Sequence, residues 1–146
     1  MPGITDPAEP YFKDGSWAWD GTGWERQPMV WGYTGRFKEN LGGTKDGNGH
    51  YSFTGAVVDP GFVRVVQALY IRNTTGARGA AWVCIRSGGA DYMIGYTLTP
   101  GVAEIVLFNG AVVLQEGDAV KVAQLDCVGD DVIEARAWGY RMRISE

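Results

Sequence analysis

Residues 132–144 read Val-Ile-Glu-Ala-Arg-Ala-Trp-Gly-Tyr-Arg-Met-Arg-Ile, and the last seven of them alternate between two kinds of side chain. The even positions from 138 to 144 are large and apolar, whereas the odd positions hold glycine or arginine. Because successive side chains of a β-strand point to opposite faces, this period of two predicts a half-buried strand. Arg141 and Arg143 then lie on the other face, where they meet solvent or pair with acidic groups across an interface.

Strand-like segments fill the rest of the chain from residue 51 onward. Each is rich in β-branched and aromatic residues and is bounded by Gly, Asp, Asn or Pro, which favours turns between short strands. The 22 glycines are about twice the usual share and disfavour long helices. We therefore predict an all-β protein, with an antiparallel β-sandwich or jelly-roll-like barrel in residues 32–146. We expect one helical turn at residues 36–41. The predicted strands are residues 51–58, 62–72, 80–86, 92–98, 102–108, 111–114, 119–127 and 132–144.

The charge and hydropathy of the chain argue against two classes of partner. The formal net charge is −4 and there is no run of Lys or Arg, so we expect neither a nucleic-acid groove nor an anionic membrane surface. No apolar run approaches the roughly 18 residues of a membrane span. The first residues have no basic region followed by an apolar one, so we expect synthesis in a cytoplasm.

Residues 1–31 differ in composition from the rest and are predicted to form an extended N-terminal arm. Four of the six prolines occur here, together with a cluster of large aromatic residues. Asp-Gly pairs favour a short hairpin of Trp17–Trp19 with Trp24–Arg26. A two-stranded hairpin cannot bury three indoles alone, so the arm must dock on the protein body or on a partner. The predicted partner-binding residues are Tyr11, Phe12, Trp17, Trp19, Trp24 and Trp31.

Few residues of the chain are suited to catalysis. His50 is the only histidine and lies in a Gly-rich stretch, so we interpret it as a loop residue and predict that the protein is not an enzyme. One histidine and two distant cysteines also give no zinc-ligand spacing. Cys84 and Cys127 are predicted to be reduced, buried thiols, with a structural disulfide as the alternative.

An acidic cluster occurs near the start of the last strand. Asp126, Asp130 and Asp131, with Glu134 nearby, offer the oxygen ligands that calcium prefers. Their spacing does not match a known calcium loop, so we predict a solvated acidic turn and no cofactor, with a calcium site as the alternative. Asn73-Thr74-Thr75 fits a glycosylation sequon, but we interpret it as an ordinary turn.

Two motifs resemble those of known structural proteins. Residues 114–122, Leu-Gln-Glu-Gly-Asp-Ala-Val-Lys-Val, resemble a late hairpin of tumour-necrosis-factor-type jelly-roll trimers and of many phage virion proteins. Residues 17–24, Trp-Ala-Trp-Asp-Gly-Thr-Gly-Trp, are similar to short hairpins in phage head and tail proteins. The chain thus resembles the capsid decoration proteins of tailed bacteriophages. This resemblance implies a virion protein on the capsid surface, a homotrimer that binds the major capsid protein, and an arm that contacts neighbouring subunits.

A second function remains open from the sequence. Exposed Trp and Tyr rings stack on sugar faces, and jelly rolls serve many lectins. A head-fibre or tail-tip module that binds a carbohydrate or receptor would use Trp17, Trp19, Trp24 and Trp82.

Overall fold

The computed structural model describes residues 17–19, 24–26 and 32–144. All of its regular structure is strand, which confirms the predicted all-β class. None of the described residues forms a helix long and apolar enough to cross a membrane. The strands are β1 (Trp17–Trp19), β2 (Trp24–Arg26), β3 (Gly32–Asn40), β4 (Gly43–Thr44), β5 (Gly49–Thr54), β6 (Phe62–Asn73), β7 (Ala81–Ser87), β8 (Ala90–Thr97), β9 (Val106–Leu114), β10 (Ala119–Cys127) and β11 (Val132–Arg143).

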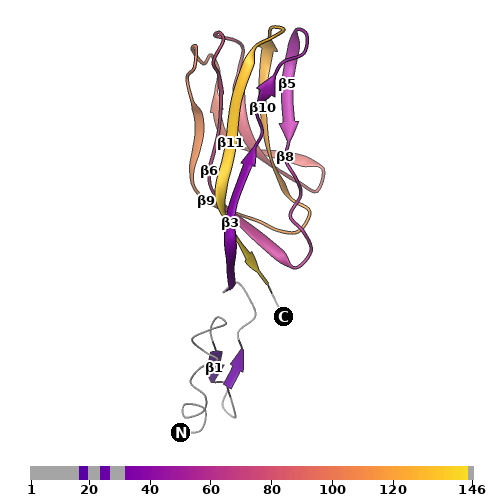
Figure 1. The fold of residues 1–146 in the computed structure, drawn as a ribbon, viewed down its shortest axis with the longest axis vertical. Helices are drawn as coiled ribbons and strands as arrows, with labels where there is room; N and C mark the ends of the chain where they lie inside the picture. Colours follow the sequence, from indigo (N-terminus) through magenta and orange to yellow (C-terminus); the bar gives the residue numbers. More distant parts are fainter. Residues whose placement is uncertain (1–16, 20–23, 27–31, 145–146) are drawn as a thin grey trace.

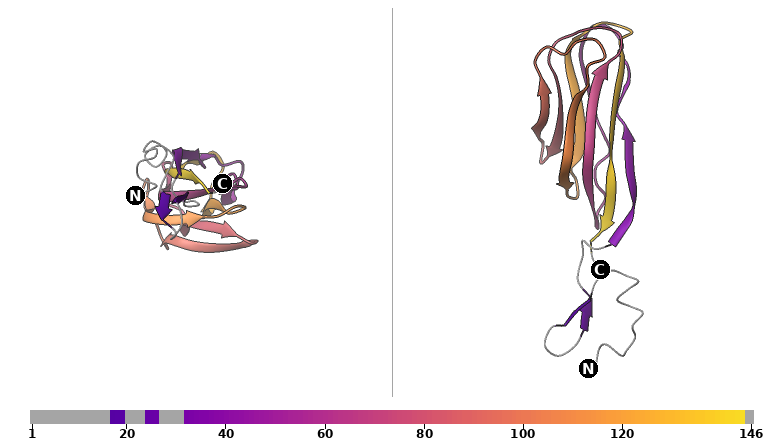
Figure 2. Two further views of the ribbon diagram at one scale, coloured as in Figure 1. Left: turned by 90° about the horizontal axis from the view of Figure 1, so that it is seen from below. Right: turned by 90° about the vertical axis from the view of Figure 1, so that its left-hand side faces the viewer.

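Eight long strands form two antiparallel sheets that pack face to face (Figures 1 and 2). One sheet has the order β3-β11-β6-β9, with the short β4 beside β11, and the other has the order β5-β10-β7-β8. The pairing is nested: β3 joins β11, β5 joins β10, β6 joins β9, and β7 joins β8. The first long strand thus pairs with the last and the pattern continues inward, as in an eight-stranded jelly roll. The predicted β-sandwich is confirmed.

The predicted N-terminal hairpin is also confirmed. Strands β1 and β2 pair antiparallel, with Trp17 opposite Arg26 and Trp19 opposite Trp24. The other residues of the predicted arm, among them Tyr11, Phe12 and Trp31, lie outside the described residues.

Two details of the predicted strand pattern are wrong. Residues 36–41 do not form a helical turn, because all but the last belong to β3, where Phe37 is buried in the core. Tertiary packing overrides a weak local preference here. The predicted strands 102–108 and 111–114 are instead a single strand, β9. Gly110 and Ala111 do not turn the chain, because they form a bulge opposite Gln67 of β6.

The core lies between the two sheets and is built from β-branched and leucine side chains. The most deeply buried members come from both sheets and from the loop after β5. Separation of the two sheets would therefore expose the apolar inner side chains of both to solvent. The largest fully buried apolar side chains are Leu41, Val58, Val66, Leu69, Ile71, Val83, Leu114, Val120 and Val122.

A bulge in β6 determines which of its residues face the core. Trp138 of β11 lies opposite Ala68, but the next residue, Gly139, lies opposite Val66, so Gln67 is an extra residue. A side chain placed on Gly139 would overlap the backbone carbonyl oxygen of Val65. Only glycine therefore allows the two backbones to approach as closely as they do at this bulge.

Replacement of Gly139 should destabilise the protein strongly. In Gly139→Ala the new methyl group has to displace backbone, which costs roughly 1–3 kcal/mol of the free energy of unfolding. Gly35→Ala is the matched control, because Gly35 lies in the neighbouring strand β3 and a methyl group added there would have no other atom within 4 Å. Urea denaturation of the two variants measures the difference. Equal midpoints for both would show that the close approach is not a constraint.

Candidate interaction surfaces

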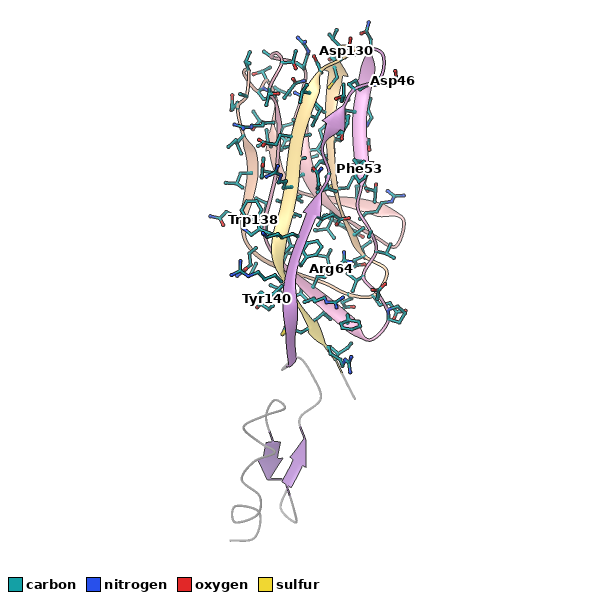
Figure 3. All side chains as sticks on the ribbon, in the orientation of Figure 1. Asp46, Phe53, Arg64, Asp130, Trp138 and Tyr140 are labelled. Atoms are coloured by element: carbon teal, nitrogen blue, oxygen red, sulfur yellow. The ribbon has the colours of Figure 1, made fainter. Side chains whose placement is uncertain are left out.

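The outer side of the β3-β11-β6-β9 sheet carries a continuous group of apolar and aromatic residues, here called the apolar face. Strand register places its members side by side: Tyr140 lies opposite Val65, and Val65 lies opposite Val113 of β9. Tyr70 of β6 lies opposite Leu107 in the same way. Figure 3 shows Trp138 and Tyr140 along β11. The members of the apolar face are Val63, Val65, Ala68, Tyr70, Leu107, Val113, Trp138, Tyr140 and Met142.

This face combines covered and open positions. Val65 is only 5% exposed although it does not belong to the core cluster, whereas Val113 beside it is 57% exposed. The Tyr70 and Trp138 rings meet edge to face, with their centroids 5.9 Å apart. Aromatic residues on a rigid sheet often dominate the binding energy of a protein interface. They bury a large apolar area and lose little side-chain conformational entropy on binding.

One margin of the apolar face is positively charged and hollowed. Arg36 and Lys38 of β3 lie opposite Tyr140 and Trp138, respectively. A hollow of about 280 Å³ lies beside the bulge, where position 139 has no side chain. Its lining consists of Arg36, Phe37, Lys38, Gln67, Trp138, Gly139 and Tyr140.

The outer side of the β5-β10-β7-β8 sheet carries a smaller aromatic group. Trp82 of β7 lies opposite Tyr96 of β8, which is 50% exposed. The His50 ring lies 6.1 Å from the Trp82 ring, measured between centroids. His50 belongs to β5 and not to a loop, so that part of the sequence interpretation is wrong. Next to this group Asp91 accepts hydrogen bonds from Arg86 and Lys121, each at 2.7 Å.

Both cysteines are free and buried, as predicted. Cys84 lies in β7 and Cys127 in β10. Burial, reinforced by the nearby Asp91 carboxylate, raises the pKa of the Cys84 thiol to about 11. Burial also raises the pKa of the Cys127 thiol. Both groups are therefore protonated at neutral pH and poor nucleophiles.

The predicted solvated acidic turn is correct for Asp126 and Asp130, which are exposed, and wrong for Asp131. Asp131 is 1% exposed, and Arg78 donates two hydrogen bonds of 2.7 Å to its carboxylate. Asn73 and the backbone N–H of Val128 donate two more, each at 2.9 Å. The Arg78 guanidinium, together with these hydrogen bonds, holds the pKa of Asp131 well below its usual range. Asp131 therefore connects the turn before β11 to the loop that carries Arg78 through hydrogen bonds.

The same region contains the residues considered for a calcium site and the Asn73-Thr74-Thr75 sequon. No three acidic, histidine or cysteine side chains of the described residues are grouped so that they could hold a metal ion. Asp126 and Asp130 are exposed, whereas Asp131 is buried. Asn73 is 3% exposed, and its side-chain oxygen accepts hydrogen bonds from the backbone of Thr75 and Gly76. Asn73 is thus the last residue of β6, and its side chain closes the bend at Thr74 and Thr75.

The Asp131–Arg78 pair predicts a pH-dependent stability. The pKa of Asp131 is lower in the folded state, so its contribution is complete above about pH 4 and is lost as the pH falls further. Asp131→Asn should cost roughly 1.5–3 kcal/mol at neutral pH, because the buried charged acceptor of the hydrogen bonds from Arg78, Asn73 and Val128 becomes a neutral amide. It should also flatten the decline of stability between neutral and acidic pH. Denaturation at several pH values measures both effects.

Asp130→Asn is the matched control for this substitution. Asp130 is exposed and has a φ of 71°, a conformation that asparagine tolerates. It should leave both stability and its pH dependence close to those of the unchanged protein. A similar loss in both variants would contradict a special role for Asp131.

The predicted arm residues are only partly placed. Trp17, Trp19 and Trp24 lie on the β1–β2 hairpin, and their register puts them at positions of one face of the ribbon.

Comparison of the chain with known protein families and with curated proteins finds no significant match. The function therefore has to be inferred from the surfaces themselves.

Proposed function

We propose that this chain is a structural protein of a bacteriophage virion, which binds the outside of the capsid as a homotrimer. In this proposal the apolar face joins copies of the chain, and the N-terminal arm contacts the major capsid protein and neighbouring subunits. The observation that carries the proposal is the apolar face, because Leu107, Val113 and Trp138 on it are 42–57% exposed, and neighbouring exposed apolar side chains are typical of a protein interface.

The division between body and arm supports two separate binding roles. The core residues that join the two sheets come from the segment between Phe37 and Ala137. The hairpin adds three tryptophans in an eight-residue stretch, and two paired strands cannot bury them alone. Tryptophan is enriched among residues that anchor interfaces, which favours a partner for the arm.

Self-association should depend on the apolar face. Val113→Lys places a charge on the most exposed member of this face, where an interface would bury the charge without a partner. We expect the trimer to dissociate to monomers at micromolar concentration, seen as a threefold fall in mass by light scattering. Leu98→Lys is the control, because Leu98 is 65% exposed but lies outside the apolar face. A trimer that survives Val113→Lys would contradict this use of the face.

Binding to the capsid should depend on the arm tryptophans. Replacement of Trp17, Trp19 and Trp24 together by alanine should abolish co-sedimentation with undecorated phage shells and leave the trimer intact. Trp82→Ala is the matched control, since Trp82 lies on the other sheet of the body. The number of copies bound per shell is the measured quantity. Full shell binding by the triple variant would contradict the proposed role of the arm.

One observation favours a second function. Trp82, Tyr96 and His50 form a compact aromatic group on the outer side of β5-β10-β7-β8, and such a group can stack on sugar rings. A head-fibre or tail-tip module would use it to bind a cell-surface carbohydrate. In the same experiment, a chain that ignores shells but binds host cell-wall glycans, and loses that binding in Trp82→Ala, would favour this second function.

A further inference from the structure

The hollow beside the bulge of β6, here called the Gly139 hollow, has the size to receive one small ring. Its middle is the Phe37–Gly139 pair of the β3–β11 register. The outer surface has no side chain there, because Phe37 is buried in the core and residue 139 is glycine. The pairs on either side of it are Arg36–Tyr140 and Lys38–Trp138. A volume of about 280 Å³ is near the lower limit of small-molecule sites, so the hollow holds one ring and not a longer chain.

The side of the sheet that holds this hollow has an excess of positive charge. Register places four cations and one carboxylate on the outer side of the β3-β11-β6-β9 sheet, a net charge of +3 in a chain whose total is −4. They are Arg36, Lys38, Arg72, Arg136 and Glu134. The carboxylate is already engaged, because Glu134 forms an ion pair with Arg72. None of the other three cations forms an ion pair with a carboxylate of residues 32–144, so an anion bound here meets uncompensated positive charge.

Arg36 and Lys38 are placed to hold one anion between them. They are alternate residues of β3, so their side chains leave the strand on the same side, from Cα atoms roughly 7 Å apart. Both side chains are exposed. Two like charges at this spacing repel each other, and a carboxylate within reach of both offsets that repulsion. The planar Arg36 guanidinium matches the two oxygens of a carboxylate, and the Lys38 ammonium adds a second charge.

The other groups that line the hollow suit a ring that carries hydroxyl groups. The Trp138 and Tyr140 side chains are both partly open to solvent, so an apolar ring face can pack against them. Gln67, the extra residue of the bulge, is exposed, and its amide both donates and accepts hydrogen bonds. A carboxylate, an apolar ring face and hydroxyl groups occur together in the six-membered ring of a sugar acid.

We propose that the Gly139 hollow binds one sugar-acid unit, with its carboxylate between Arg36 and Lys38 and its ring against Trp138. The Gln67 amide hydrogen-bonds the hydroxyl groups of the ring. This site differs in charge and in place from the Trp82 group on the opposite sheet. Binding here requires no capsid shell, so failure of the proposed virion function would leave it standing.

NMR titration of the full-length protein with glucuronate tests this site. The readout is the indole N–H signal of Trp138, identified by its absence from Trp138→Phe. We expect this signal to shift with a dissociation constant on the order of 1 mM, because one ring in an open hollow buries little area. The indole signal of Trp82, on the opposite sheet, should not move. Neutral glucose should bind about tenfold more weakly, because it lacks the carboxylate.

Charge substitutions of equal size separate the hollow from the rest of the surface. Arg36→Gln with Lys38→Gln should weaken glucuronate binding about tenfold. Arg141→Gln with Arg143→Gln is the matched control, because it removes the same charge at the same spacing from the neighbouring strand β11. Both control arginines lie over the Phe62 ring and do not line the hollow, so binding should be unchanged. Equal losses in the two double variants would overturn the proposal.

Two further measurements exclude other reasons for binding or for its absence. Acetate carries the carboxylate without the ring, so equal affinities for acetate and glucuronate would overturn the proposed ring site. The titration is repeated on Val113→Lys, in which the charge on the apolar face keeps another copy of the chain from covering the hollow. A Trp138 signal that glucuronate shifts in neither protein would overturn the proposal.

Discussion

The close backbone approach at Gly139 is the constraint on which the two sides of the β3-β11-β6-β9 sheet depend. It accommodates the extra residue Gln67 in β6, and this extra residue reverses the alternation of the strand. Before the bulge Val65 faces outward, and after it Leu69 faces the core. The outward-facing residues of β6 are therefore odd-numbered before the bulge, at Val63 and Val65, and even-numbered after it, at Ala68 and Tyr70.

The two sheets have different outer surfaces, and the difference suits different tasks. The β3-β11-β6-β9 sheet presents a broad apolar face with a cationic margin. The opposite sheet presents the compact Trp82 group beside a salt-bridged aspartate, Asp91. At the far end of the sandwich, Asp131 is committed to Arg78 and serves stability. In the proposed function, the binding surfaces and the stabilising Asp131–Arg78 contact thus lie in separate parts of one small fold.

Much of the fold could be predicted from the sequence, because its strands are strongly patterned. The segment at residues 119–127 and the tryptophan hairpin were predicted with the bounds that the structure has. Local pattern could not reveal β3, because glycines and charged residues surround the buried Phe37 and give no clear strand pattern. It also could not reveal that β9 continues through Gly110. The alternation of residues 138–144 put Trp138, Tyr140 and Met142 on one side of a strand, but local pattern could not reveal the rest of the apolar face. Its strands are far apart in the sequence, and the bulge that turns Val65 outward depends on pairing with β11.

The central claim, that the apolar face is covered by other copies of the chain, is tested most directly by hydroxyl-radical footprinting of the full-length protein at assembly concentration. Trp138 on the apolar face and Tyr96 on the opposite sheet serve as internal probes, because they are 42% and 50% exposed in the single chain. The account predicts that Trp138 is protected in the concentrated sample and oxidised on dilution, while Tyr96 is oxidised equally in both. Equal oxidation of Trp138 at every concentration would contradict it.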